Sequence, residues 1–311
     1  MKKTSFLILF VVASAIGISL SAIAETPDKK ETTDTRTLKI DKRFTGLQSY
    51  AGIEITYTQD TNPSRAIING PSEIVNKITW EVDSKGVLSF TLPKQNKGYK
   101  GKITIQLNGG LLTNYNAISG STINVTTAVK AKEPLNFAVY SSANIILRKD
   151  VEATGEDINI AGASSGEVIF LSSVKCEDVN IALASSSTVK IPTLYSSATR
   201  YAGSSTGILE IGTVDIQEFD IALASGGECN LKEGKVDTLN IACASGGEFI
   251  GHTLTIGGMA LSASSGGTIT IKGECESAEM AAASGGNINV GGLKISKIKA
   301  QKSSSGGSIN I

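Results

Sequence analysis

From about residue 101 onward, the chain alternates apolar and polar residues and returns to a small-residue turn at nearly constant intervals. The turns read ALASSS at 182–187, ALASGG at 222–227 and ACASGG at 242–247, and the intervals between successive turns are 19 to 23 residues. A period that steady is the signature of a solenoid. The last small residue of each turn is Gly101, Ser121, Ala143, Gly166, Ser187, Gly207, Gly227, Gly247, Gly267, Gly286 or Gly307.

Apolar residues keep the same phase in every repeat. Large apolar residues stand six positions before the last residue of the turn (Ile181, Ile221) and again two and four positions after it (Leu209, Ile211), with polar residues between them. Alternation of period two at a constant phase predicts stacked strands with one face inward. A repeat of about 20 residues is too short for a propeller blade, and the leucine-rich signature is absent. We therefore expect an all-β parallel β-helix with two or three short strands per turn.

The N-terminal part differs in pattern. Residues 38–100 contain strand-like segments such as GIEITYTQ and KITWEV, separated by the turn sequences DTNPS, GPSE and DSKG. We expect an irregular β section at 38–100 and regular repeats at 101–311. Residues 25–37, ETPDKKETTDTRT, are polar and charged, which predicts a flexible leader.

Residues 1–24 have the layout of a secretory signal peptide. Two lysines precede an apolar run from Phe6 to Leu20, and Ala22-Ile23-Ala24 predicts cleavage before Glu25. The alternative is an uncleaved membrane anchor. No second apolar segment of spanning length follows, so we expect no membrane span after cleavage. The predicted location is the periplasm, the outer-membrane surface or the extracellular space.

The composition of the chain indicates what kind of side chains fill the core and which partners are not expected. Apolar residues make up 41% of the chain but aromatic residues only 5%, so the core must be mainly aliphatic. Lys plus Arg and Asp plus Glu both number 29, and this balance gives no indication of a nucleic-acid partner. All four cysteines, Cys176, Cys229, Cys243 and Cys275, fall in apolar columns of the repeat, which predicts buried free thiols rather than a disulfide or metal site.

The glycines of the repeated turn are interpreted as structural. A corner between strands needs a positive φ or a close backbone approach at one position per turn, and glycine permits both. A phosphate-binding loop would need a following helix and a lysine, and neither is present. The predicted structural turn residues are Gly166, Gly207, Gly227, Gly247, Gly267, Gly286 and Gly307.

Alanines recur five and three positions before the last residue of each turn. If the neighbouring apolar columns point inward, these alanines point outward and form a flat, mildly apolar strip. One interpretation is that copies of the protein or a partner dock there; the other is that small residues face water on a thin wall. The candidate strip is Ala182, Ala184, Ala222, Ala224, Ala242, Ala244, Ala281 and Ala283.

Residues for catalysis are scarce. His252 is the single histidine, so a histidine-based metal cluster or triad has no further members. Glu167, Glu228 and Glu248 share one outward column without a recurring basic partner, as expected for a solubilising edge. We therefore predict no enzyme activity, no cofactor and no metal site.

The N-terminal section resembles a known family. The segments RFTGLQSYAGIEITYTQ, INGPSEIVNKITWEV, GVLSFTL and KITIQL lead into Ser-Gly turns, as in the Bacteroidetes family called putative auto-transporter adhesin, head GIN domain. The similarity extends from about Leu38 to Ile311. The resemblance implies a pectin-lyase-like β superhelix of two main sheets, without conserved catalytic residues and with cell adhesion as its proposed role. Matching positions are Phe44, Gly46, Gly52, Ile53, Ile55, Tyr57, Gln59, Gly70, Pro71, Val87 and Leu88.

Three classes of function remain open. The first is an exported, non-catalytic adhesin-like or scaffold protein that binds an unknown protein or glycan ligand, or another copy of itself, through a flat repetitive face. The second is a carbohydrate-binding or polysaccharide-degrading β-helix, although the only tryptophan, Trp80, lies outside the repeats. The third is a structural envelope protein or a sensor-associated domain.

Overall fold

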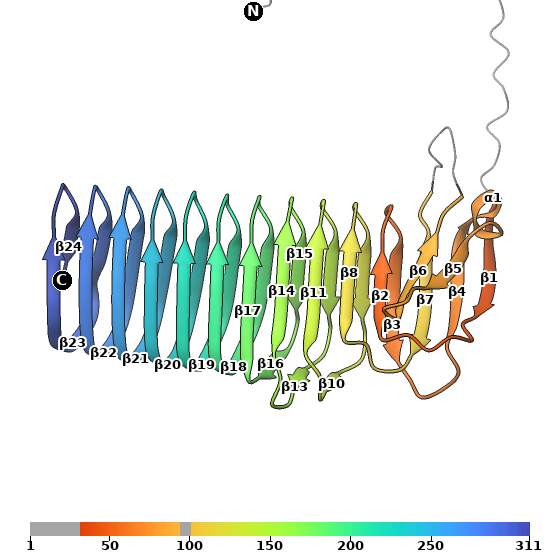
Figure 1. Cartoon of the computed structure of the whole chain (residues 1–311), viewed down its shortest axis with the longest axis horizontal. Helices are drawn as coiled ribbons and strands as arrows, with labels where there is room; N and C mark the ends of the chain where they lie inside the picture. The colour runs from red at the N-terminus through yellow and green to blue at the C-terminus, as the bar shows by residue number, and fades with distance from the viewer. Residues whose placement is uncertain (1–31, 94–100) are drawn as a thin grey trace, which may run out of the picture. The chain divides into compact units, whose positions relative to one another are not determined.

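The computed structural model of the chain describes residues 32–93 and 101–311, and 68% of it is strand and 1% helix. Residues 32–311 form one compact unit, in which N-terminal strands precede a parallel β-solenoid of about ten turns with about 20 residues per turn (Figure 1). The predicted β-helix is confirmed. The predicted signal peptide at 1–24 and residues 25–31 of the predicted leader lie outside the described residues.

Each regular turn contributes to three columns of strands, here called faces A, B and C. Within the described residues this is one more than the two main sheets implied by the resemblance. Face A contains β8 (Asn114–Ile118), β11 (Leu135–Tyr140), β14 (Ile158–Ala163) and β17 (Asp178–Leu183). Face B contains β9 (Thr122–Val125), β12 (Asn144–Leu147) and β15 (Glu167–Phe170), and face C contains β10 (Val129–Ala131), β13 (Val151–Ala153) and β16 (Ser173–Cys176).

From residue 188 onward, each long strand bends through all three faces before the next corner. The register stays fixed over many turns, so that Ile181, Tyr201, Ile221 and Ile241 lie on successive rungs of face A. These strands are β18 (Thr188–Gly203), β19 (Ile208–Leu223), β20 (Glu228–Cys243), β21 (Glu248–Ser264), β22 (Thr268–Ala283) and β23 (Asn287–Ser303), followed by β24 (Ser308–Asn310).

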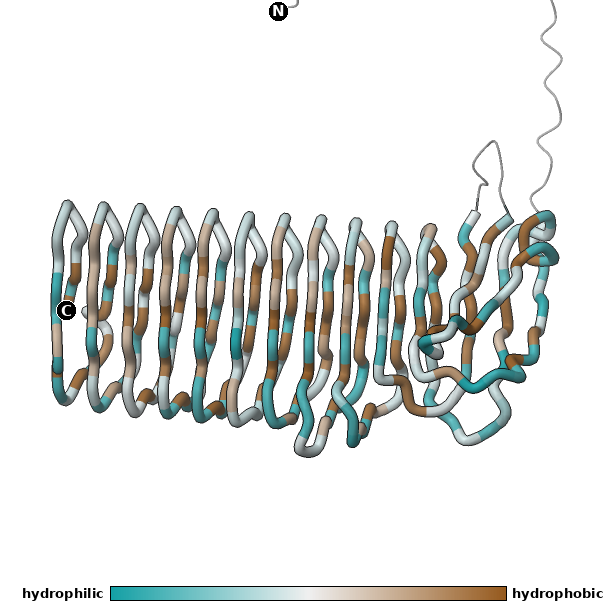
Figure 2. The backbone as a smooth tube through the Cα atoms, viewed as in Figure 1, coloured by the Kyte–Doolittle hydropathy of each residue, from teal (hydrophilic) through white to brown (hydrophobic). Residues whose placement is uncertain are grey.

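The chain rises along face A, crosses a corner and descends along face B while it advances away from the N-terminal end, which is a right-handed winding (Figure 1). Apolar residues alternate with polar ones along each coil (Figure 2). Inward columns are buried and mainly aliphatic, with Leu209, Ile211, Val214 and Ile221 each at most 3% exposed. Burial of these columns supplies the main force that holds the coils together, because each buried side chain of this size contributes about 1.5–3 kcal/mol.

The small-residue corner between faces A and B is a tight type I′ turn. In the corner 224–227, Ser225 has φ 51° and Gly226 has φ 77°, and the Gly227 amide donates to the Ala224 carbonyl at 2.9 Å. The left-handed conformation therefore occurs at two positions in this corner, not at one as expected from the sequence. One of the two is a serine in every corner from Ser119 to Ser305: Ser119, Ser141, Ser164, Ser185, Ser205, Ser225, Ser245, Ser265, Ser284 and Ser305.

The last glycine of the corner has a different role from the turn glycine before it. Gly227 is not among the residues with positive φ, and a Cβ there would lie 2.2 Å from the Gly203 carbonyl oxygen of the preceding coil. The same close approach to backbone occurs at Gly166, Gly207, Gly247, Gly267, Gly286 and Gly307. Glycine is thus needed at these positions because the coils pack closely there.

The N-terminal section contains a coil that the sequence pattern did not reveal. Strands β2 (Gly46–Ser49) and β3 (Glu54–Gln59) pair in parallel with β8 and β9, so they already belong to faces A and B. On their other side they pair with β6 (Val87–Thr91) and β7 (Thr104–Gly109), which come later in the chain. The first coil in sequence is therefore the second coil in space.

The predicted start of the domain at Leu38 is five residues late. Strand β1 (Thr33–Lys39) pairs antiparallel with β4 (Arg65–Pro71) over its whole length, so residues 33–37 are not a flexible leader. The prediction relied on the polar composition of these residues. Strand β1 is itself an exposed edge strand, where few apolar residues are needed. The short helix α1 (Ser72–Val75) buries Ile74 and Val75, and β5 (Thr79–Val82) forms a hairpin with β6.

The cysteines are free thiols. Cys229, Cys243 and Cys275 are buried, as predicted, whereas Cys176 is half-buried. Cys176 is the last residue of the face C strand β16.

Candidate functional site

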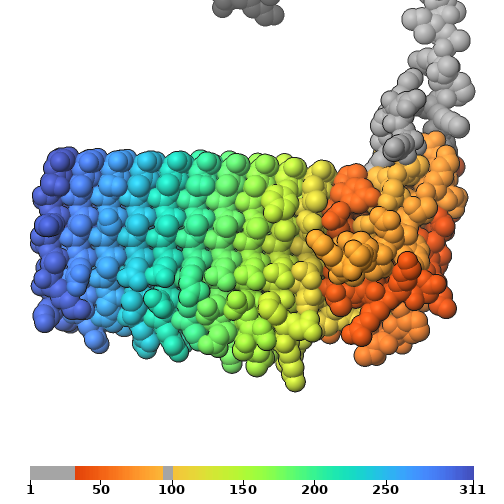
Figure 3. All heavy atoms as spheres, in the orientation of Figure 1, coloured from red at the N-terminus to blue at the C-terminus, as the bar shows by residue number. Residues whose placement is uncertain are grey.

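The outward columns of face A line an open groove. This groove of about 1030 Å³ runs along the face from Val87 on β6 (Val87–Thr91), the neighbour of β2, to Ala260 on β21. Its floor follows the solenoid axis, across the strands rather than along them. Figure 3 shows this face, with side chains of equivalent positions aligned in rows along the axis.

The predicted alanine strip lies on this face with its side chains outward. Ala182, Ala222 and Ala242 are exposed and line the groove. The column nearer the corner, Ala184, Ala224 and Ala244, is half-buried and lines an adjoining hollow of about 620 Å³ together with Tyr140. Ala281 and Ala283 continue both columns on β22 but do not line either hollow. The outward orientation is as expected; a docking role stays a prediction.

Beside the alanines runs a ladder of asparagine amides that the sequence analysis did not assign to a site. The Nδ2 atoms of Asn136, Asn159 and Asn180 each donate to the Oδ1 atom of the asparagine on the preceding coil, at 3.1, 3.2 and 3.1 Å. The first acceptor in the ladder is Asn114. The polar column was visible in the sequence, but only the strand register shows that its amides bind one another.

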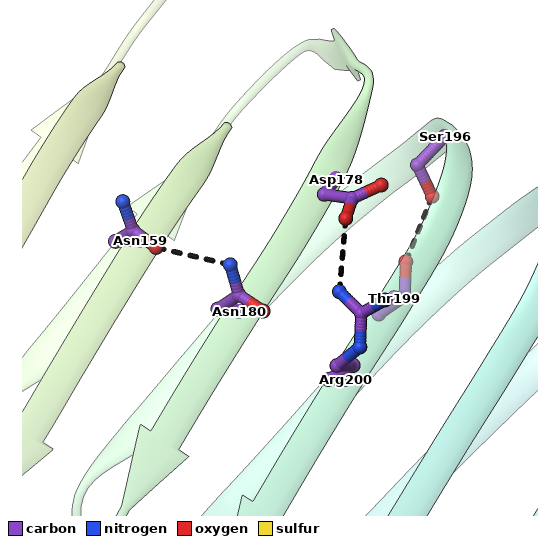
Figure 4. A network of polar contacts seen from close by, with 6 residues as sticks. All are labelled: Asn159, Asp178, Asn180, Ser196, Thr199 and Arg200. Atoms are coloured by element: carbon purple, nitrogen blue, oxygen red, sulfur yellow. Dashed lines mark hydrogen bonds and ion pairs between the residues drawn. The ribbon is translucent and has the colours of Figure 1, made fainter. Parts of the chain in front are cut away.

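Arg200 interrupts the ladder, as Figure 4 shows. It takes the place of an asparagine on β18, and its guanidinium binds the Asp178 Oδ2 atom at 2.9 Å. This hydrogen bond and the attraction to Asp178 raise the pKa of Arg200. Two rungs further on, the Asn240 Nδ2 atom donates to Asp220 Oδ1 at 2.8 Å, so the column returns to side-chain hydrogen bonding.

One polar pair is buried on the inner side of the same coil. Ser196 and Thr199 occupy positions that are apolar in other coils, and their hydroxyls lie 2.7 Å apart (Figure 4). Both side chains are almost completely covered. Because one hydroxyl donates to the other, both have a hydrogen-bond partner, and the pair is a part of the core and not an open reactive site.

The residues weighed for catalysis do not meet at the groove. His252 is exposed on β21 and lines a separate hollow with Lys190 and Glu210. Glu228 and Glu248 are neighbours in register on face B, whereas Thr188 and Ile208 separate Glu167 from them. Within residues 32–93 and 101–311, no three His, Cys, Asp or Glu side chains are grouped to hold a metal ion.

Among the described residues, no helix has the length and apolar character needed to cross a membrane.

Two crystal structures share this fold. One is a putative adhesin from Parabacteroides merdae, with a TM-score of 0.52, 16% identity, and coverage of 88% of this chain and 96% of that one. The other is a putative adhesin from Parabacteroides distasonis, with a TM-score of 0.51, 12% identity, and coverage of 90% and 97%. At these identities the likeness concerns the fold alone. No curated protein sequence matches the chain.

The family comparison covers nearly all of the described residues. Residues 43–255 and 211–311 match the model of the family described as putative auto-transporter adhesin, head GIN domain. The match includes β2 and β3, whose sequence carried the resemblance, and every regular coil. The chain belongs to this family of putative adhesins.

Proposed function

We propose that the protein is an exported, non-catalytic adhesin-like module that binds a partner through the groove of face A. The observation that carries this proposal is the continuity of the groove over successive coils, with an amide ladder on one side and small alanines on the other. A repetitive surface of this kind favours extended contact. A reaction centre would instead require different groups that converge on one point.

Export is part of the same proposal. It rests on the signal-like segment at 1–24 and on membership of an adhesin family. We expect the mature protein to begin at Glu25 and to be recovered with the cell envelope or the medium. N-terminal sequencing of the protein from its producing cells tests this expectation, and an intact Met1 in protein from the cytoplasm would contradict it.

Binding through face A is tested with a charge placed in the groove. Ala222 is exposed and its neighbours in register are Ala202 and Ala242, so an Ala222→Glu side chain would project into the groove without meeting another charge on an adjacent rung of its column. We expect adhesion of the purified full-length exported protein to its target surface to weaken by about tenfold or more, because an unpaired carboxylate must be desolvated on contact.

The matched control is Thr270→Glu on β22. Thr270 is an outward residue of face B, and its neighbours in register are Ile250 and Asn289. This variant introduces the same charge on the same solenoid but away from the groove. Equal adhesion of both variants and the wild-type protein would contradict the proposed function.

A further inference from the structure

The groove of face A has the dimensions of a site for a long ligand. Its volume of about 1030 Å³ is at the upper end of the usual range of about 300–1,000 Å³ for small-molecule pockets, so the length of the groove, and not its volume, indicates a long ligand. It extends over all coils from β2 to β21, one rung after another. On the basis of the function proposed above, we infer that its occupant is an uncharged, unbranched glycan that lies along the solenoid axis.

The amide ladder retains hydrogen-bonding capacity for such a ligand. Asn136 and Asn159 each use one N–H to donate to the preceding coil and one lone pair to accept from the following coil. A primary amide has two N–H groups and two acceptor lone pairs, so one donor and one acceptor per rung remain. These amides are half-exposed and line the groove. A polymer with hydroxyl groups on every unit can both donate to and accept from this row.

The first part of the groove adds an acceptor that the protein does not satisfy. Asn116 on β8 donates to Gln48 Oε1 at 3.2 Å, while its Oδ1 atom is buried without a hydrogen-bond partner among the described residues. Both Asn116 and Gln48 line the groove. If the Asn116 side chain turned towards the groove, a ligand hydroxyl could donate to this atom and remove the cost of an unsatisfied buried acceptor.

The charges of the groove favour an uncharged ligand. Its charged lining residues are Asp83, Lys85, Arg200 and Asp220, two of each sign. Arg200 is already paired with Asp178, and Asp220 accepts from Asn240. An anionic or cationic polymer would therefore find no excess of opposite charge along the groove.

The repeat length of the ladder argues against an extended peptide. Equivalent amides on adjacent coils recur at the strand spacing of about 4.8 Å, whereas equivalent groups of an extended peptide recur every two residues, at about 6.6 Å. A peptide along the axis would lose its register with the ladder after a few coils. An unbranched pyranose chain carries hydroxyl groups on both edges of every sugar, so each sugar can donate to or accept from the amide row without a fixed side-chain register.

A second copy of the chain has the right spacing but the wrong shape. Face A is concave along this groove, so two copies placed face to face would leave both grooves unfilled. The alanine column instead allows a narrow chain to approach closely, because no long side chain projects from Ala182, Ala202 or Ala222. Tyr140, with 38% of its surface exposed at the edge of the adjoining hollow, offers one ring against which a sugar can stack.

The test measures binding of neutral hexasaccharides by the exported full-length protein. The probes are cellohexaose, mannohexaose, xylohexaose and chitohexaose, with an oligogalacturonate of the same length as the anionic comparison. We expect the protein to bind at least one neutral probe and to bind the anionic probe about tenfold more weakly. Absence of binding to all four neutral probes, or preference for the anionic probe, would overturn the inference.

The ladder is tested with the double variant Asn159→Ala and Asn180→Ala. Alanine already occupies this column at Ala260, so the coil accepts it. We expect neutral-glycan binding to fall by about tenfold or more. The control is Asn230→Ala on face B, where the amide binds Glu228, and we expect it to retain wild-type affinity. Equal affinity of the ladder variant and the wild-type protein would overturn the inference.

The outcome also separates this inference from the proposed function. If Ala222→Glu abolishes adhesion while no neutral glycan binds, face A is a docking surface with another occupant, and the glycan inference fails alone. A native mass that changes from dimer to monomer in Ala222→Glu would identify that occupant as a second copy. If Ala222→Glu leaves adhesion intact, the proposed function fails whatever the glycan result.

Discussion

At the scale of single residues, the repeated corner places two different demands on its small residues. Gly226 and Ser225 supply the left-handed backbone of the turn, while Gly227 permits the close approach of two coils. The first demand can be met by several residue types at a modest cost, whereas the second requires a residue without a Cβ atom at Gly227, although the equivalent position is Ser121, Ala143 or Ser187 in three other corners. Glycine and serine in the same motif therefore differ in how replaceable they are.

We predict that Gly227→Ala destabilises the solenoid by about 1–3 kcal/mol, the usual cost of overpacking. The added Cβ would meet the Gly203 carbonyl group, which is backbone and cannot rotate away. Ser225→Gly is the control, because it removes a side chain at φ 51° and should change stability little in comparison. Thermal unfolding of the three proteins measures the difference, and equal midpoints would contradict the explanation given for Gly227.

The buried thiols predict a loss of stability at high pH. Burial raises the pKa of Cys243 from 9.0 to about 12, and it raises the pKa of Cys229 well above 9.0. The unfolded chain therefore loses its thiol protons at lower pH than the folded chain does. The stabilising contribution is complete below pH 9 and declines as the pH rises from about 9 towards 12.

This contribution can be isolated with Cys243→Ala. Unfolding midpoints of this variant and the wild-type protein, measured between pH 7 and 11, should converge as the pH rises, because alanine does not titrate. A difference between them that stays constant with pH would contradict the assignment. The small cavity left by the substitution lowers the midpoint at all pH values and does not change this comparison.

At the scale of elements, the regular coils were predictable because sequence neighbours are also neighbours in space. The columns at Ile181, Ile221 and Leu209 gave the inward phase, and the structure buries all three. The position of β2 and β3 was not predictable in this way. Their partners β6 and β7 lie 41 and 50 residues downstream (Gly46 to Val87 and Glu54 to Thr104), after β4, α1 and β5 have intervened. A local pattern carries no information about such distant pairing.

The candidate site likewise has features that a local sequence pattern predicts and features that depend on the assembled fold. The outward phase of Ala222 and Ala242 followed from alternation, but the groove depends on the shape of the whole face. The Asn159 and Asn180 column was visible as polar residues. Its hydrogen-bonded ladder became apparent only when the strand register placed these amides about 3 Å apart.

We predict that hydrogen exchange is slowest in the middle coils and fastest at β24. Strands β19 to β22 are paired on both sides over nearly their full length, whereas β24 pairs over three residues with β23 alone among the described strands. Backbone amides that are shielded by two neighbouring coils open less often than those at an edge. Mass-spectrometric exchange of the native protein tests the order; uniform exchange along the solenoid would contradict it.

At the scale of the whole molecule, a repetitive scaffold presents one long groove along face A. The coils fix equivalent side chains at the strand spacing, so the amide ladder and the alanine columns are properties of the repeat and not of any one turn. Membership of an adhesin family agrees with a molecule that acts through an extended surface.

Two exposed tyrosines provide the most direct measurement of which face binds the partner. Tyr140 is 38% exposed beside the alanine columns of face A, and Tyr195 is 43% exposed in the face C segment of β18. Nitration of both residues would be compared between the free exported protein and the protein bound to its target surface. The account predicts that binding protects Tyr140 and leaves Tyr195 as reactive as before; protection of Tyr195 with no change at Tyr140 would contradict it.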